Sequence, residues 1–122
     1  MEMCGNRPNT ADKTCVVDGD TIWLHGEKIR LKDFDTPEPN PCNSTCQSGG
    51  TELEDELADV ASARSLELLN GKDWTIERFG VDSTQDKRRL ATIRQDGQDV
   101  GDILVAKGLA RRWPDGARFW CQ

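Results

Sequence analysis

The 122-residue sequence contains no tyrosine and only one histidine, and it lacks any long apolar run. With one histidine and no pair of Cys-x-x-Cys motifs, a zinc site is not expected. No stretch is apolar enough to span a membrane. Positive charge is also scarce, since 16 basic residues face 22 acidic ones for a net charge of −6. Such a balance opposes the approach of a polyanion at long range, unless a bound cation offsets it locally.

The length predicts a single domain spanning residues 1–122, with a core over about 13–112 and a short tail over 113–122. Residues 1–12 are polar and lack the apolar segment of a signal peptide. We therefore expect either an intracellular protein or a mature region whose leader has been removed.

Five cysteines are many for so short a chain, and the number is odd. Two disulfides and one free thiol suit an exported protein with a small core. We expect Cys4 to pair with Cys15, and Cys121 to pair with either Cys42 or Cys46. The export hypothesis places the protein outside the cytoplasm, secreted or periplasmic. The alternative is a cytoplasmic protein with five reduced thiols.

Hydrophobic patterns predict three strands, a helix, two strands and a second helix. The expected strands cover residues 15–17, 21–25, 28–32, 74–79 and 89–94, and the expected helices cover about 52–70 and 100–107. The first helix follows a capping box that begins at Thr51, and the second follows the cap Asp99. The spacing of apolar residues in the first helix predicts which of them face the core: Leu53, Leu57, Val60, Ala61 and Leu68. This order is compatible with an OB-type barrel but does not by itself select it over other α+β folds.

The stretch from Val16 to Glu38 carries most of the chemical information. Asp20 lies in a turn, and Asp35 and Glu38 follow a hairpin that would fold them back beside it. Arg30 alternates with apolar residues and so points away from the core. Oxygen ligands of this kind suit a hard cation such as Ca²⁺ better than zinc. His25 adjoins the glycine of the hairpin turn, and we interpret it as a surface residue.

The sequence resembles the staphylococcal nuclease (thermonuclease) family in an ordered set of motifs. They are Asp18-Gly19-Asp20-Thr21, Ile29-Arg30-Leu31, Asp35-Thr36-Pro37-Glu38, Arg88-Arg89-Leu90-Ala91 and Gly108-Leu109-Ala110. The resemblance implies an α+β, mainly β fold: a five-stranded OB-fold barrel with two helices. It also implies a Ca²⁺ ion held by the carboxylates of Asp20 and Asp35 and by the backbone carbonyl of Thr36. Asp18 would support these ligands from behind.

The resemblance also assigns the catalytic roles. Glu38 matches the residue usually assigned as the general base, while Arg30 and Arg88 match the arginines that grip the phosphate. No aromatic-glycine pair precedes Arg88, so the choice between Arg88 and Arg89 rests on the Arg-x-Leu-Ala spacing.

Substrate contacts are harder to predict. Lys87, Arg89 and Trp113 are candidates, although Trp113 could replace the tyrosines on which family members stack a base only if the tail folds over the site. We expect Trp113 and Trp120 to pack on the barrel or a helix instead.

The resemblance implies a Ca²⁺-dependent, sugar-non-specific endonuclease that hydrolyses DNA and RNA to 3′-phosphate products. We expect a monomer without membrane contact. The alternative is a catalytically silent OB-type module that binds nucleic acid or a protein. The motif residues favour the enzyme, whereas the acidic charge and the absent tyrosines favour the module.

Overall fold

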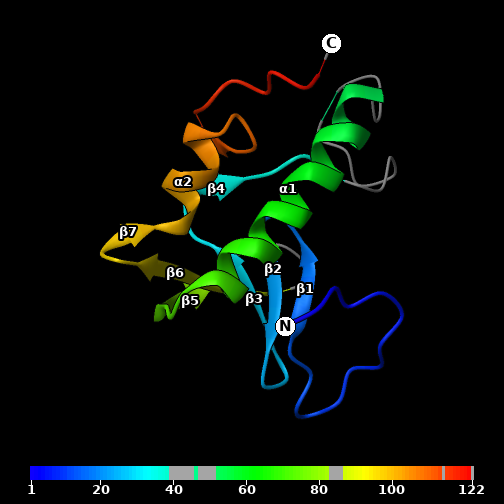
Figure 1. Cartoon of the computed structure of the whole chain (residues 1–122), viewed down its shortest axis with the longest axis vertical. Helices are drawn as coiled ribbons and strands as arrows, with labels where there is room; N and C mark the ends of the chain where they lie inside the picture. Colours follow the sequence, from blue (N-terminus) through cyan, green and yellow to red (C-terminus); the bar gives the residue numbers. More distant parts are fainter. Residues whose placement is uncertain (39–45, 47–51, 83–86, 114, 122) are drawn as a thin grey trace.

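The computed structural model describes residues 1–38, 46, 52–82, 87–113 and 115–121. The described residues form one larger sheet, a small two-stranded sheet and two helices (Figure 1). The elements are β1 (Cys15–Asp18), β2 (Thr21–Leu24), β3 (Glu27–Leu31), β4 (Phe34–Asp35), α1 (Glu52–Gly71), β5 (Thr75–Val81), β6 (Arg89–Gln95), β7 (Gln98–Asp99), α2 (Val100–Ala106) and β8 (Arg111–Arg112).

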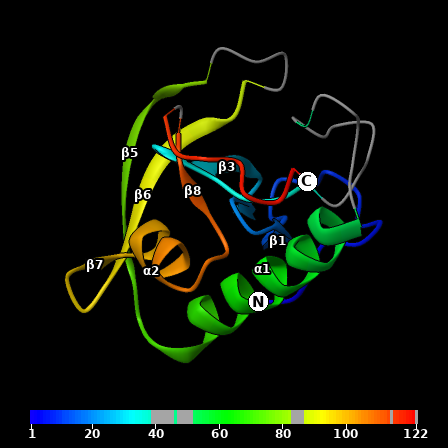
Figure 2. The same ribbon diagram turned by 90° about the horizontal axis from the view of Figure 1, so that it is seen from above.

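The larger sheet has the strand order β1-β2-β3-β6-β5, and β7 pairs with β6. All its pairs are antiparallel except β3 with β6, which run parallel. Figure 2 shows this sheet curving from β5 and β6 round to β3 and β1, with both helices on one side. The α+β, OB-like prediction is confirmed. The pairs formed by the described strands leave the barrel open, and the two-residue strands β4, β7 and β8 were not predicted.

Two turns with positive φ at both central residues form the hairpins. His25 and Gly26 have φ of 48° and 82° between β2 and β3, and Asp96 and Gly97 have φ of 51° and 77° between β6 and β7. These values match the primed turns that fit the twist of antiparallel strands. His25 is exposed, as predicted.

Helix α1 packs against β1 through small side chains. Ala58 and Ala61 are fully buried, and Ser62 and Ser65 nearly so. Small residues let the helix approach the sheet closely. The predicted apolar face was wrong at Val60, which is 52% exposed, because tertiary packing selected a face of small residues instead.

Two disulfides cross-link the chain, over sequence separations of 11 and 75 residues. Cys4 pairs with Cys15, as predicted, and Cys46 pairs with Cys121, which was one of the two predicted alternatives. Cys42 lies outside the described residues. Trp120, next to the second disulfide, is fully buried, so its prediction as a packing residue is confirmed. Within the described part of the chain, neither helix has the length and apolarity needed to cross a membrane.

Candidate active site

Two acidic segments, the turn at residues 18–21 and the segment at residues 35–38, meet because Gly19 has no side chain. A Cβ atom at Gly19 would lie 2.9 Å from the Thr36 side chain, and the φ of this glycine is not positive, so close approach and not backbone freedom explains the residue. The backbone N–H of Thr36 donates to Asp20 Oδ2 at 3.3 Å. From α1, Ser65 Oγ donates to the Gly19 carbonyl at 3.1 Å. The turn is thus held between α1 and the segment after β4.

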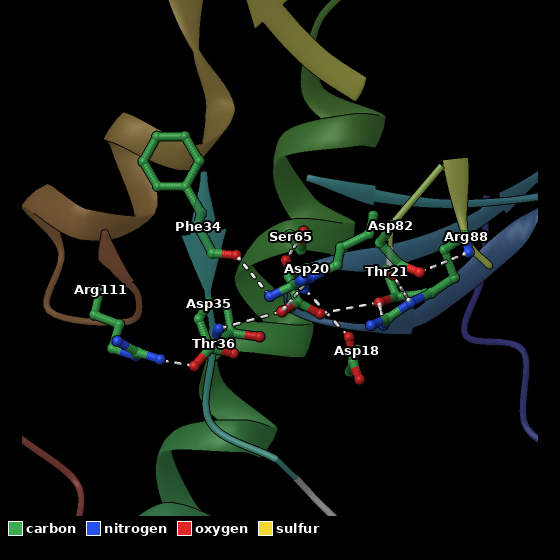
Figure 3. A network of polar contacts seen from close by, with 12 residues as sticks. Asp18, Asp20, Thr21, Phe34, Asp35, Thr36, Ser65, Asp82, Arg88 and Arg111 are labelled. Carbon is green, nitrogen blue, oxygen red and sulfur yellow. Dashed lines mark hydrogen bonds and ion pairs between the residues drawn. The ribbon is translucent and has the colours of Figure 1, made fainter. Parts of the chain in front are cut away.

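Asp20 lies at the centre of a hydrogen-bond network (Figure 3). Its backbone N–H donates to Asp18 Oδ1 at 3.2 Å, and its own Oδ1 accepts the Thr21 hydroxyl at 2.9 Å. Arg88 Nη1 in turn donates to Thr21 Oγ1 at 2.9 Å. Asp18 therefore fixes the backbone of Asp20 within the turn, and its support of a bound cation stays a prediction.

The structure separates the two adjacent arginines. Arg88 is held by Asp82, whose carboxylate accepts its Nε at 3.0 Å and its backbone N–H at 3.2 Å. Arg89 turns instead to Glu27, with Nε 3.3 Å from Oε2. Lys87 is exposed and has a φ of 46°. Of these three basic residues, the geometry brings Arg88 to Thr21 and Asp20. Asp82 had no signal in the sequence analysis.

Arg30 approaches Asp20 from β3. Its Nε lies 4.0 Å from Asp20 Oδ2, and its Nη2 donates to the Phe34 carbonyl at 3.4 Å. Among the described residues, this buried Nε has no hydrogen-bond partner. Trp113 places its ring centroid 5.4 Å from the Arg30 guanidinium carbon and is 47% exposed. Trp113 therefore lies against Arg30 of β3 and keeps part of its surface exposed, and its contact with substrate stays a prediction.

Asp35 forms a buried ion pair that the sequence analysis missed. Arg111 Nε donates to Asp35 Oδ2 at 2.9 Å, and the two side chains are 3% and 8% exposed. Arg111 Nη1 also donates to the Gly116 carbonyl at 2.9 Å. The two residues are register partners in the β4–β8 pair. This pairing could not be read from the Gly108-Leu109-Ala110 motif that precedes Arg111.

Glu38 is positioned by Glu54, which the sequence analysis interpreted only as part of a helix cap. Its backbone N–H donates to Glu54 Oε2 at 3.1 Å, and Glu54 is fully buried. Glu54 Oε1 also lies 3.7 Å from Cys46 Sγ. Glu54 is the fourth residue of the capping box predicted to begin at Thr51, and Thr51 lies outside the described residues. Its burial on the first turn of α1 instead supports the segment carrying Glu38.

Burial and crowding of negative charge shift the pKa values of the site. Burial, and then the neighbouring Asp20, raise the pKa of Asp18 well above its usual value. The same two causes raise the pKa of Asp35, against the opposing effect of Arg111. Burial, followed by the charges of Asp20 and Asp35, raises the pKa of Glu38 to about 7. The site therefore gathers several carboxylates in an environment that is partly shielded from water.

The donor set fits a hard cation. Within the described ranges, no group of three or more acidic, histidine or cysteine side chains could hold a metal ion. The predicted ligands are only two carboxylates, those of Asp20 and Asp35, together with the backbone carbonyl of Thr36, so they would not form such a group. All three are oxygen donors, as Ca²⁺ prefers. The Thr36 hydroxyl is buried and, among the described residues, has no hydrogen-bond partner. A cation would also relieve the repulsion that raises the pKa values here.

Comparison with known proteins agrees with this geometry. A family model described as staphylococcal nuclease homologue matches residues 28–117. Endonuclease YncB of Bacillus subtilis (strain 168) is 37% identical over 101 residues, which cover 78% of this chain and 44% of that protein. The SPbeta prophage-derived endonuclease YokF of the same organism is 36% identical over 101 residues, covering 78% and 31%. The chain thus spans less than half the length of these two relatives. The family match covers most of the chain, which belongs to the staphylococcal nuclease family.

Proposed function

We propose that this protein is a Ca²⁺-dependent endonuclease that hydrolyses phosphodiester bonds in DNA and RNA and leaves 3′-phosphate products. One observation carries the proposal: two arginines and the carboxylates of two separate segments converge beside Asp20 (Figure 3). The names of the two relatives, both endonucleases, support it.

The cation would be held by the carboxylates of Asp20 and Asp35 and by the Thr36 carbonyl. When bound, Ca²⁺ supplies positive charge that neutralises the phosphoryl oxygens and polarises a water molecule. Asp18 and the Thr21 hydroxyl orient Asp20 by their hydrogen bonds. Arg111 orients Asp35 by occupying one of its oxygens.

The chain's own residues then supply the remaining chemistry. Glu38 accepts a proton from the water as its oxygen bonds to phosphorus, and the bond to the 5′-oxygen breaks. The leaving oxygen takes a proton from solvent, which gives a 3′-phosphate and a 5′-hydroxyl. Arg30 and Arg88 donate to the phosphoryl oxygens, where charge accumulates in the transition state. Both guanidiniums are already fixed, Arg88 by Asp82 and Arg30 by the Phe34 carbonyl.

A digestion assay tests the proposal. Plasmid DNA and a structureless RNA are incubated with the protein in Ca²⁺, and then with a chelator in excess. We expect cleavage of both in Ca²⁺ only, and its loss in Arg30→Gln. Arg112→Gln is the matched control, because Arg112 is 62% exposed and pairs with Asp102 at the surface. Cleavage by Arg30→Gln at the wild-type rate would contradict the role proposed for Arg30.

The catalytically silent module is the alternative, and its support is the net charge of −6. It predicts that neither substrate is cut at any Ca²⁺ concentration.

A further inference from the structure

The tail that follows β8 is tied to the rest of the chain at two places. Arg111 of β8 forms the buried ion pair with Asp35, and further along the tail Cys121 forms a disulfide with Cys46. Between these two places, Arg111 Nη1 donates to the Gly116 carbonyl at 2.9 Å. Figures 1 and 2 both show the end of the tail close to the first turn of α1. The tail therefore connects β4, which carries a predicted cation ligand, to the start of α1.

One buried side chain lies between this disulfide and the proposed general base. Glu54 is fully buried on the first turn of α1, and its Oε2 accepts the backbone N–H of Glu38 at 3.1 Å. Its other oxygen, Oε1, lies 3.7 Å from Cys46 Sγ, and Cys46 is only 7% exposed. Polar contacts are strong where water is excluded. The two oxygens of one carboxylate thus connect the disulfide to the segment that carries Glu38.

The redox state of Cys46 changes what the Glu54 carboxylate meets. In the disulfide, Cys46 Sγ carries no hydrogen, and its bond to Cys121 fixes its position. After reduction, Cys46 is a thiol that is no longer joined to the tail, and at this distance its S–H can donate to Glu54 Oε1. Loss of the thiol proton would instead place a thiolate beside the carboxylate. In either form, the group that holds the Glu38 N–H has a different neighbour.

We propose that Glu54 is a positioning residue for Glu38 that works only while the Cys46–Cys121 disulfide is intact, an inference that rests on the proposed function. The nuclease is active in its oxidised form and slows when a dithiol reduces this bond. The dithiol gives up two hydrogen atoms and closes to a cyclic disulfide, the Cys46–Cys121 bond breaks, and each cysteine becomes a thiol. Cys121 is partly exposed, so a reductant thiolate can attack its sulfur. Such control suits an exported nuclease, because a reducing cytoplasm keeps it slow until its cysteines are oxidised outside.

The other disulfide provides the matched control. Cys4–Cys15 holds the N-terminal segment on β1, whereas Cys46–Cys121 holds the tail beside α1. Cys4→Ser/Cys15→Ser therefore leaves only the second disulfide to be reduced, and Cys46→Ser/Cys121→Ser leaves only the first. Each variant also carries Cys42→Ser, so that no free thiol can exchange with the remaining bond.

Cleavage of a labelled oligonucleotide in Ca²⁺, before and after dithiothreitol, gives kcat and KM for both variants. The variant that keeps Cys46–Cys121 should lose roughly 10–100-fold in kcat on reduction with KM nearly unchanged, as expected for a misplaced base. The variant that keeps Cys4–Cys15 should be slow from the start and should not respond. Circular dichroism at the assay temperature shows that each is folded. An equal response in the two variants, or none in the first, would overturn the proposal.

Substitutions of Glu54 separate positioning from a merely structural role. Glu54→Leu removes the acceptor of the Glu38 N–H and should lower kcat by roughly tenfold or more, whereas Glu54→Gln keeps an acceptor oxygen and should restore most of the rate. Glu56→Leu is the control, because it makes the same change at an exposed glutamate of α1. Rates that are equally low in Glu54→Leu and Glu54→Gln, or in Glu54→Leu and Glu56→Leu, would contradict the role of Glu54.

Hydrogen exchange followed by NMR tests the coupling without any cleavage. Reduction of the Cys46–Cys121 bond should speed exchange of the Glu38 N–H by roughly tenfold or more. The Lys32 N–H, which donates to the Ala91 carbonyl at 2.8 Å, should exchange as before. Equal acceleration at Lys32 would mean that reduction loosens the whole sheet, and no acceleration at Glu38 would mean that the disulfide does not hold it. Both results would overturn the coupling.

The two readouts distinguish this inference from the proposed function. If reduction releases the Glu38 N–H but the oxidised protein cuts no nucleic acid at any Ca²⁺ concentration, the nuclease is refuted and the coupling of the disulfide to Glu38 stands. If the oxidised and reduced proteins cut at the same rate in Ca²⁺, the nuclease stands and the redox control is refuted.

Discussion

Arg111 and Asp35 lie 76 residues apart in the chain, and they form a nearly fully buried ion pair with Nε 2.9 Å from Oδ2. The pair joins β8 to β4, and β4 leads directly to the candidate cation ligands. Figure 3 shows Arg111 and Asp20 approaching Asp35 from opposite sides. Arg111 thus fixes the Asp35 carboxylate through its Oδ2 atom.

The first prediction concerns this pair. Arg111→Gln should lower the free energy of unfolding by about 3–5 kcal/mol, because it leaves the buried Asp35 carboxylate without its charge partner. Arg112→Gln, one residue further along β8, should cost at most about 1 kcal/mol, since its pair with Asp102 is exposed. Urea denaturation of both variants measures the difference. Similar losses in the two variants would show that the ion pair is not what holds the tail to β4.

The second prediction concerns the contact between the acidic segments. Gly19→Ala places a Cβ 2.9 Å from the Thr36 side chain and should cost about 1–3 kcal/mol through overpacking. Gly80→Ala is the control, because a Cβ there meets nothing within 4 Å and Gly80 lies in β5, away from the acidic turn. Thermal unfolding compares the two. If Gly19→Ala is as stable as Gly80→Ala, the close approach of the turn to Thr36 is not tight in solution.

Much of the fold could be predicted because its signals are local. The hairpin turn at Asp96-Gly97, the cap at Asp99 and the alternation of β3 all depend on neighbouring residues. The cap was correct in detail, since Asp99 Oδ1 accepts the Gly101 N–H at 2.9 Å. Val60 was misplaced because helical spacing does not say which of two adjacent faces meets the sheet.

The candidate site was predicted in its motif residues but not in the residues that hold them. Glu54 and Arg111 act through contacts that form only when separated segments meet, with partners 16 and 76 residues away. Asp82 contacts Arg88 only six residues further along the chain, but no motif marks it. Their residue types are ordinary for an acidic helix start, a loop and a tail. Nothing local distinguishes a buried carboxylate at Glu54 from the solvated ones beside it.

The third prediction is that Ca²⁺ stabilises the fold. The unfolded chain cannot hold Asp20 and Asp35 together, so binding to the native state adds about 2.7 kcal/mol at a concentration of 100 times the dissociation constant. Thermal melts with and without Ca²⁺ should show a raised midpoint in the wild type and a smaller rise in Asp20→Asn. An unchanged melting midpoint at millimolar Ca²⁺ would mean that Asp20 and Asp35 do not bind the cation.

The fourth prediction concerns the cysteines and, with them, the proposal that the protein is exported. Non-reducing mass analysis should find two disulfides, Cys4 with Cys15 and Cys46 with Cys121, and one thiol. Replacing the second pair by serines should destabilise more than replacing the first, by about 4.5 against about 3 kcal/mol, because it closes the longer loop. Five cysteines that react with an alkylating agent without denaturant or reductant would remove the argument for export.

The most direct test of the central claim is the initial rate of strand cleavage as a function of Ca²⁺ concentration, in the wild type, Glu38→Gln and Asp20→Ala. If Glu38 is the base, Glu38→Gln lowers the plateau rate by about 10²–10⁴ while the Ca²⁺ midpoint stays near that of the wild type. Asp20→Ala instead raises the Ca²⁺ midpoint, because it removes an oxygen ligand and not a proton acceptor. A Glu38→Gln variant with full activity at saturating Ca²⁺ would contradict the account, and the water would then be activated without this carboxylate.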